Sequence, residues 1–252
     1  MRPNQFLRLV VLDYPKLLLG QSQAYSIFGD LVRCRQKLFL DTSDSFLVID
    51  KHDLIGTHFL TYDLSNPFKP TLIAGFRITY QDRAQAHGLT MPIESALPCC
   101  PPEATSQYQE FCREKGNMIQ FNTLFIDPQY TFSKSQLKLS DMLFFAVCAF
   151  IRRLGFNHYV GATNDRLKTD RWMKRAGEYS RPTFSFSHPD VQDPHTLFFI
   201  DALNNAWLLD CFDEYRHFWN LAYEIIPDRI KTKSFAQVRE EIVNAQPIRK
   251  AS

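Results

Sequence analysis

The sequence predicts a mixed α/β fold (α+β) whose central sheet is flanked by helices, because strand-like and helix-like segments alternate through its middle. Residues 118–127 are rich in strand-forming side chains and end at Pro128, which cannot donate to a sheet ladder. The apolar segment 136–154 has the length of a buried helix, and residues 158–163 form a second predicted strand. Such a crossover normally makes its two strands parallel. Residues 117–177 are therefore expected at the centre of the fold.

The segments before this unit predict one helix and a set of antiparallel strands. Residues 21–40 carry apolar side chains at helical spacing, which predicts an amphipathic helix packed on the sheet. Strand-like runs follow at 45–49, 57–62 and 71–80, and the polar residues 63–69 join the last two as a hairpin. The front half of the sheet is therefore expected to be mainly antiparallel.

Two loops and a short helix complete the expected surroundings of the central strand. Residues 81–102 contain four prolines, which favour an irregular loop of a length that is often functional. A short helix is expected at 106–115 and a polar loop at 129–135. The start of the helix after that loop is the expected place for a ligand, because helix N-termini offer free N–H groups.

After the second strand of the unit, Asn164 can cap a helix that ends at Gly177. Four further elements are expected in order: strands at 183–186 and 196–200, a long aromatic helix at 203–224, and a weaker helix from Lys231 onward. We expect one domain over residues 1–202 and a C-terminal helical extension, 203–252, packed on it.

Composition narrows the class of protein. The 252 residues suit one large domain, and a formal charge of +2 without a basic stripe argues against a nucleic-acid binder. Two apolar runs near the N-terminus are separated by residues 13–16, so neither is a membrane span or a signal-peptide core, and a cytoplasmic protein is expected. Six cysteines without a paired C-x-x-C spacing predict free thiols and no metal site.

Three short motifs occur in order before the central unit. Arg35 is followed four residues later by Phe39, Asp50-Lys51-His52-Asp53 is followed by His58, and Ala74-Gly75-Phe76-Arg77 ends in an arginine. This order resembles the acyl-homoserine-lactone synthases and the related N-acyl amino acid synthases of the acetyltransferase (GNAT) superfamily, over roughly residues 25 to 180. The resemblance implies a GNAT-like mixed sheet. It also implies an N-acyltransferase that moves a fatty acyl group from acyl carrier protein or acyl-CoA to the amine of an amino acid or related metabolite.

The resemblance assigns roles to particular residues. It implies Asp50, Asp53 and His58 as the groups that bind and deprotonate the amine, and an acyl-CoA or acyl-phosphopantetheine as co-substrate, with no permanently bound cofactor. Backbone N–H groups of a strand that opens away from its neighbour would stabilise the oxyanion. The remaining candidates are Arg35, Phe39, Arg77, Gln120 and Asn122 for the substrate, and Leu124, Phe125, Ile126, Lys134, Ser135 and Gln136 for the acyl carrier.

The sequence also departs from the family's pattern. Gln120 and Thr123 stand where lactone synthases carry a Glu and an Arg, and Val48 stands where an acidic residue precedes Asp50. The loop 131–136 lacks the glycines with which acetyltransferases bind a pyrophosphate, and Met173 occupies the place of a tyrosine acid.

Each candidate has a structural alternative. A structural ion-pair network is the alternative role for Arg35, Asp50, Asp53 and Arg77. A hydrogen-bonded strand histidine is the alternative for His58. Lys134 and Lys138 are either solvated charges or contacts for a phosphate or an acidic carrier protein. The phenylalanines 39, 46, 76, 144, 145 and 150 are either core or the lining of an acyl tunnel. Two functional alternatives remain open: a lactone-signal synthase, and a non-catalytic acyl-binding or scaffold protein.

Overall fold

The structure, a computed structural model, describes residues 6–39, 48–136, 138–165, 170–178, 181–188, 193–228, 230 and 233–245. Within these residues an eight-stranded mixed sheet has the order β10-β1-β2-β3-β4-β5-β8-β7. Its strands are β1 (Leu7–Asp13), β2 (Thr57–Asp63), β3 (Thr71–Tyr80), β4 (Ile119–Ile126), β5 (Tyr159–Asn164), β7 (Phe184–Phe186), β8 (His195–Ile200) and β10 (Tyr223–Ile225). The short strands β6 (Gly177–Glu178) and β9 (Ala202–Leu203) pair separately.

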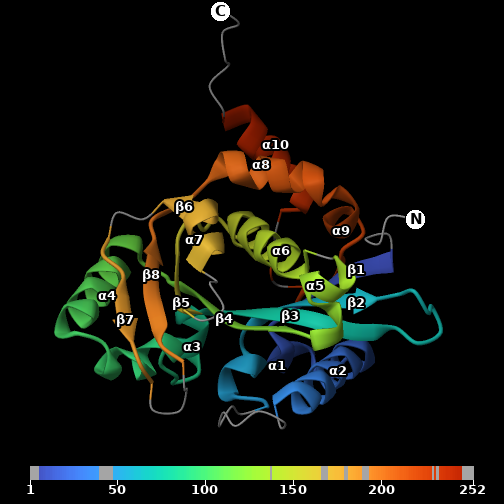
Figure 1. Ribbon diagram of the computed structural model, residues 1–252, viewed down its shortest axis with the longest axis horizontal. Coiled ribbons are helices and arrows are strands. Elements are labelled where there is room, and N and C mark those ends of the chain that lie inside the picture. The colour runs from blue at the N-terminus through green and yellow to red at the C-terminus, as the bar shows by residue number, and fades with distance from the viewer. Residues whose placement is uncertain are drawn as a thin grey trace, which may run out of the picture.

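The sheet changes direction at its centre. Strands β1 to β4 are antiparallel, β4 and β5 run parallel, and β8 is antiparallel to both β5 and β7. In Figure 1, β2 and β3 run across the view while β7 and β8 stand upright at its left. The predicted mixed sheet, the antiparallel front half and the parallel central pair are thereby confirmed.

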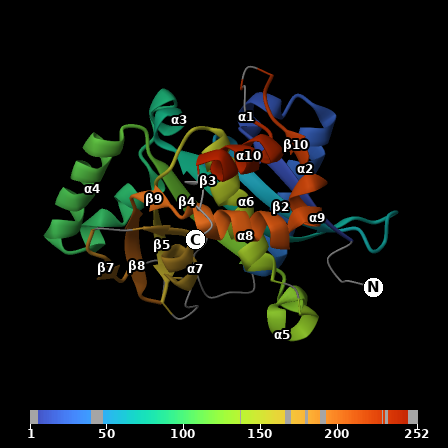
Figure 2. The same cartoon turned by 90° about the horizontal axis from the view of Figure 1, so that it is seen from above.

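Helices cover both faces of the sheet. Helices α1 (Pro15–Leu18) and α2 (Ser22–Phe39) lie on one face, below β2 and β3 in Figure 1. Helix α6 (Leu139–Arg153) lies on the other face, with α8 (Asn205–Glu214) and α10 (Phe235–Ala245) stacked over it (Figure 2). Helix α4 (Pro102–Lys115) flanks the upright strands and packs its buried face against β5 and β8.

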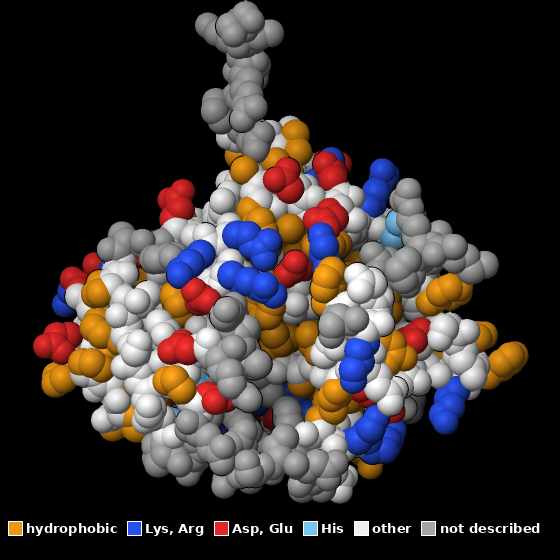
Figure 3. Space-filling model, in the orientation of Figure 1, with side chains coloured by type: hydrophobic (Ala, Val, Ile, Leu, Met, Phe, Trp, Pro, Cys, Tyr) orange, Lys and Arg blue, Asp and Glu red, His pale blue; other side chains and the backbone are white. Residues whose placement is uncertain are grey.

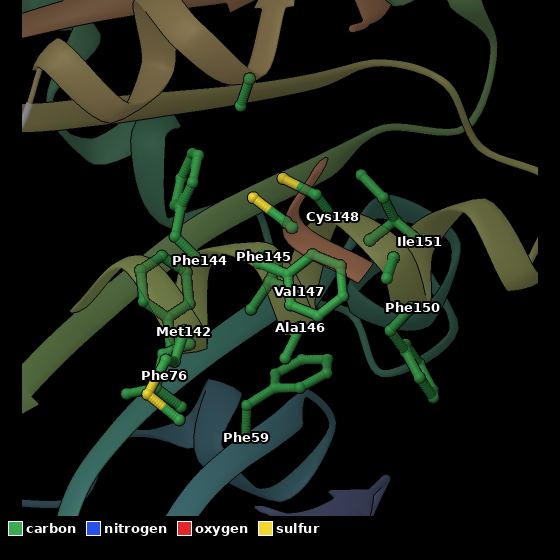
Figure 4. Packing of buried hydrophobic residues seen from close by; sticks show 14 of the residues in the cluster. Phe59, Phe76, Met142, Phe144, Phe145, Ala146, Val147, Cys148, Phe150 and Ile151 are labelled. Carbon is green, nitrogen blue, oxygen red and sulfur yellow. The ribbon is translucent and has the colours of Figure 1, made fainter. Parts of the chain in front are cut away.

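The largest part of the core lies between the sheet and α6, which is apolar almost all round. Residues 142–151 of this helix are at most 1% exposed. Figure 4 shows Phe59 and Phe76 reaching from the strands toward Ala146 and Met142 of the helix. A helix that is hydrophobic on every side must be buried on every side, which explains why α8 and α10 cover its outer face.

Several expected loops contain helical turns. Residues 81–102 were expected to be irregular, but form α3 (Gln81–Ala86), η3 (Pro92–Ser95) and η4 (Leu97–Cys99), and α4 already begins at Pro102. The prolines stand in the first turns of these helices, where the missing N–H group costs nothing. The polar loop 129–135 likewise contains η5 (Pro128–Tyr130) and α5 (Phe132–Ser135), which projects from the body in Figure 2.

The C-terminal prediction is partly wrong. One long helix was expected at 203–224, but the backbone breaks at Tyr215 (φ −104°, ψ 27°) into α8 and α9 (Arg216–Asn220), and β10 follows. β10 pairs in parallel with β1, a strand that the sequence did not predict. Asn164 was expected to cap a helix, but it ends β5, and α7 (Asp170–Ala176) begins later. The expected strand at 45–49, including Phe46, lies largely outside the described residues.

The predictions made from composition concern membrane spans, cysteine thiols and metal sites. No helix in the described ranges combines the length and the apolar character that a membrane crossing requires. The six cysteines are free thiols, with Cys148 and Cys211 buried and the other four half-buried. Across the same described ranges, His, Cys, Asp and Glu side chains form no group that could hold a metal ion.

Candidate active site

Two arginines and two aspartates meet under the sheet, on the α2 face. Arg35 of α2 donates through Nη1 to Oδ1 of Asp53 at 2.7 Å, and Nη1 of Arg77 on β3 lies 2.7 Å from the same oxygen. Arg77 also donates to Oδ1 of Asp50 at 2.8 Å. The charges of the four side chains balance, which permits their burial.

A short helical turn, η2 (Lys51–Leu54), carries both carboxylates. Asp50 is its N-cap: Oδ1 accepts from the backbone N–H groups of His52 (2.7 Å) and Asp53 (3.2 Å). In return, Oδ2 of Asp53 accepts from the N–H of Asp50 at 2.9 Å. This reciprocal capping box fixes the spacing of the two carboxylates, which explains the Asp-x-x-Asp motif.

The two aspartates differ in their access to solvent. The side chain of Asp53 is 1% exposed, whereas that of Asp50 is 34% exposed. Every hydrogen bond to the Asp50 carboxylate within the described part of the chain reaches Oδ1. Oδ2 of Asp50 is therefore the oxygen through which this cluster can accept a bond from outside.

Both carboxylates are held ionised. Burial alone would raise the pKa of Asp53, but the charges of Arg77 and Arg35 outweigh it and lower that pKa. Burial likewise opposes ionisation of Asp50, yet the hydrogen bond with His52 and the charge of Arg77 bring its pKa far below the ordinary value. A carboxylate of such low pKa is a weak proton acceptor and stays charged at neutral pH. Asp50 is thus suited to bind an ammonium group.

The two histidines near the cluster support its backbone. His58 on β2 is fully buried, its Nε2 bonds to the backbone oxygen of Asp53 at 2.8 Å, and its ring packs edge-on against Phe28. Burial lowers the pKa of His58 to about 4, so its ring is neutral at neutral pH. His52 bonds through Nε2 to the backbone oxygen of Thr90 at 2.8 Å.

Strands β4 and β5 separate after a short stretch of pairing. They pair only at Gln120 with Val160 and at Phe121 with Gly161, although β4 continues to Ile126 and β5 to Asn164. On its other side β4 bulges, because Gly75 pairs with Phe125 and Arg77 with Asn122, leaving two residues opposite Phe76. One of these is Thr123, which adopts φ +45°. The strands open as a V, as the resemblance implied.

The open edge of β4 carries backbone groups without a strand partner. The N–H of Asp127 donates to Ile73 of β3 at 2.8 Å. Because successive N–H groups of a strand point to opposite edges, the N–H of Ile126 faces the gap left by β5. This edge is the place where a carbonyl oxygen or an extended amide chain can bind.

The aspartate cluster and the gap are adjacent. Arg77, which holds Asp50, lies opposite Asn122 on β4, the first residue beyond the last pair with β5. Phe125 also joins the two: its ring fills the space over Gly75, where a Cβ atom would lie 2.5 Å from it, and the guanidinium of Arg35 sits 5.6 Å from its centre. The structure therefore brings Arg35, Asp50, Asp53, His58 and Arg77 to one place beside the opening.

The other predicted residues fall around this centre. Oε1 of Gln120 accepts from the N–H of Ile93 at 2.8 Å and so ties η3 to the sheet. Asn122 donates through Nδ2 to Thr79 (2.9 Å) and to the backbone oxygen of Gln120 (3.1 Å). Phe39 is the last residue of α2, and its side chain lies outside the described part of the structure.

The expected phosphate site must be corrected. The N–H groups of Lys134 and Ser135 donate to the backbone oxygen of Thr131, and that of Gln136 to Phe132, so all three are already used within α5. The following helix begins at Leu139 rather than at Gln136, because Gln136 adopts a left-handed conformation (φ +59°) that ends α5. Any free N–H groups at a helix start here belong to the first turn of α6.

No protein-family model and no curated protein sequence matches the chain. Solved structures do resemble it. BjaI, a CoA-dependent acyl-homoserine lactone synthase, superposes with a TM-score of 0.54 in its structure with SAM and isopentyl-CoA; identity is 11%, over 93% of this chain and 99% of that chain. In its structure with MTA, the TM-score is 0.51 at 9% identity. MesI, another CoA-dependent lactone synthase, gives 0.50 at 11% identity, over 83% of this chain and 95% of that chain.

The fold is that of acyl-homoserine lactone synthases. The GNAT-like fold inferred from the motifs is thereby confirmed. The lactone-synthase fold is present without the Glu and Arg expected on the central strand: Gln120 is engaged by Ile93, and Thr123 occupies the bulge. The bulge was missed because a β-branched residue gives no sequence signal for a positive φ.

Proposed function

We propose that the protein is an N-acyltransferase that moves an acyl group from an acyl thioester to the amine of an amino acid or a related metabolite. The observation that carries the proposal is the partly exposed side chain of Asp50, held beside the point where β4 leaves β5. The Asp50 carboxylate can bind a cation, and the open edge of β4 offers hydrogen bonds to a carbonyl. An aminolysis of a thioester requires both.

The amine acceptor would bind through its ammonium group to Asp50. The strongly lowered pKa of this carboxylate keeps it charged, so it would hold and orient the ammonium rather than take up its proton. A carboxylate on the same acceptor has donors nearby: Nε and Nη2 of Arg35 and Nε of Arg77 are buried and lack partners among the described residues. These donors are covered by protein atoms, so an acceptor carboxylate would reach them only if residues around the cluster move on binding.

The thioester would lie in the gap between β4 and β5. The backbone of residues 124–126 would bind the carbonyl, and the same edge would pair with the amides of the pantetheine arm in the manner of an added strand. The amine nitrogen attacks the carbonyl carbon, the N–C bond forms and the C–S bond breaks. Before the attack the bound ammonium gives one proton to solvent water. As the amide forms, the nitrogen gives up a second proton, and the departing sulfur takes one up as a free thiol.

The carrier of the acyl group is a phosphate-bearing arm, either of CoA or of acyl carrier protein. Arg171, Lys174 and Arg175 are exposed on α7, and blue side chains gather over this helix in Figure 3. Lys138, at the start of α6, donates to Glu214 at 3.0 Å. Lys174 and Arg175 pair with Asp170 and Asp141, so the support that this region gives to a negatively charged carrier rests mainly on Arg171.

The test is to incubate the purified chain with acyl-CoA thioesters and a mixture of amino acids, and to measure free thiol together with N-acyl products by mass spectrometry. Asp50→Asn keeps the size of the side chain but removes its charge, and should lower kcat/KM by about 10- to 150-fold, the worth of a hydrogen bond to a charged group. Asp210→Asn, at an exposed position on α8, is the matched control. Thiol release that is equal in both variants would refute the role of Asp50.

A lactone-signal synthase is the second candidate, and the overall likeness to BjaI and MesI favours it. It would use SAM, which is bound in the BjaI structure, as the amine acceptor. Supplying SAM with an acyl-CoA separates the two candidates: an acylated homoserine lactone in the mass spectrum supports the synthase. Acylated amino acids, with SAM left intact, support the first proposal.

A further inference from the structure

The closed end of the V is filled with aromatic side chains. The rings of Phe121 on β4 and Tyr159 on β5 stack in parallel, with centroids 3.8 Å apart and an angle of 1° between the planes. Phe144 of α6 meets both rings edge-on, at 5.5 Å and 6.4 Å. These three side chains occupy the space between the strands and α6 at the point where the gap begins.

This packing leaves no room for a channel under α6. Phe121 is 4% exposed, Phe144 1%, and Tyr159 0%. A channel wide enough for a methylene chain would leave free surface on the side chains that line it, and these three side chains have almost none. The phenylalanines that were possible tunnel lining, 76, 144, 145 and 150, are core residues.

The gap is also closed on its other sides near the apex. Gly161 is covered by Met173 of α7, whose Cε atom would lie 3.0 Å from an added Cβ. On the α2 face, Gln120 holds η3 against the strand through Ile93. Beyond the apex the half-buried residues are Asn122, Thr123, Leu124 and Ile126 on β4 and Ala162 and Asn164 on β5, a set that mixes polar and apolar side chains.

These distances limit the acyl group. If the thioester carbonyl is held against residues 124–126, three residue steps separate Leu124 from Phe121, about 10 Å of strand. Part of that length is taken by the side chain of Phe121. We infer that the protein accepts short acyl groups, of about six carbons or fewer, and excludes long fatty acyl chains. This inference rests on the proposed acyl transfer and names its substrate class.

The experiment uses the full chain and CoA derivatives of increasing length: acetyl, butyryl, hexanoyl, octanoyl and dodecanoyl. Thiol release measures turnover, and thermal shift with the corresponding S-alkyl-CoA thioethers measures binding without turnover. We expect kcat/KM to be about 100-fold lower for dodecanoyl-CoA than for the best short thioester. Dodecanoyl-CoA turned over as fast as butyryl-CoA, or a dodecyl thioether that binds as tightly as the butyl one, would overturn the inference.

The binding readout separates the two proposals. Short thioethers that bind in preference to long ones, with no thiol released from any thioester, would support the size limit and refute the acyl transfer. Failure of every thioether to bind would overturn the size limit as well.

A pair of variants on α6 tests the cause. Phe144→Ala removes the ring that meets Phe121 and Tyr159, and should raise activity with octanoyl-CoA relative to butyryl-CoA. Phe145→Ala is the matched control, because Phe145 faces the other way, toward Phe212 (5.0 Å) and Tyr215 (5.8 Å). Met173→Ala opens the gap with less loss of core, and serves if Phe144→Ala does not fold. If Phe144→Ala or Met173→Ala folds and keeps the same preference for acyl length, the packing at the apex of the gap does not set the size limit.

Discussion

Arg35 and Asp53 form an ion pair at 2.7 Å in which neither side chain is more than 2% exposed. The residues come from different elements, α2 and η2, and Arg77 adds a third element, β3, to the same oxygen of Asp53. The pair therefore joins the covering helix to the sheet at the candidate site. Its charge balance is local, so the loss of one member leaves a buried charge without compensation.

We expect Asp53→Asn to lower the free energy of unfolding by about 3–5 kcal/mol, because Arg35 and Arg77 would lose their shared buried carboxylate. Urea denaturation followed by circular dichroism measures this. Asp170→Asn removes an exposed pair with Lys174 and should cost less than about 0.5 kcal/mol. If the free energy of unfolding falls by the same amount in both variants, the buried network contributes no more to stability than an exposed ion pair.

Stability should fall between pH 6.5 and pH 4 because of His58. The unfolded imidazole, with a pKa near 6.5, takes up a proton in this range, whereas burial keeps the pKa of the folded residue at about 4. The unfolded state thus binds more protons, and stability is lost as pH falls, by up to about 3 kcal/mol. Urea midpoints in steps of pH check this, and His58→Gln should flatten the slope. A slope that persists in His58→Gln would assign the effect to other groups.

Gly75→Ala should destabilise the protein by about 1–3 kcal/mol, because the new Cβ would lie 2.5 Å from the ring of Phe125 and 3.0 Å from the side chain of Leu60. Gly20→Ala is the control, since a Cβ added there would meet nothing within 4 Å in the described part of the chain beyond its immediate neighbours. Thermal unfolding compares them, and a variant at position 75 as stable as that at position 20 would disprove the close contact.

Gln120→Leu should loosen η3, because the buried N–H of Ile93 would lose its acceptor, at a cost of about 1–3 kcal/mol. Hydrogen exchange measured by mass spectrometry should show faster exchange in peptides that cover Ile93. Gln85→Leu, at an exposed position on α3, supplies the comparison. If Ile93 exchanges at the same rate in both variants, Gln120 does not hold this turn.

Local pattern predicted most of the sheet. The strands at 57–62, 71–80 and 158–163 and the central strand lie within two residues of their predicted ends, because alternation or continuous apolarity is visible in each. β10 was missed because its three residues are too few for a periodic signal. β1, which pairs with β2 along all seven of its residues, was missed because its apolar run was considered only as a membrane or signal segment.

The site could be predicted in outline only. The order of Arg35, Asp50, Asp53 and Arg77 indicated a cluster, and the structure brings these side chains together. Sequence spacing could not tell that Asp50 is partly exposed while Asp53 is buried, since Asp53 is covered by Arg35 of α2 and Arg77 of β3, which are distant in sequence. The roles of these residues in catalysis stay a prediction.

The pairing of β1 with β10 has a consequence for synthesis of the chain. Val10 of β1 pairs with Tyr223 of β10, so β10 leaves the ribosome about 200 residues after β1. At ordinary translation rates that delay is on the order of tens of seconds. Throughout it, one side of β1 remains an uncovered edge of the kind that recruits other chains. The C-terminal segment thus covers this edge only at the end of synthesis. A ribosome that stalls before Tyr223 would release a product with β1 exposed, and such a product would be prone to aggregate.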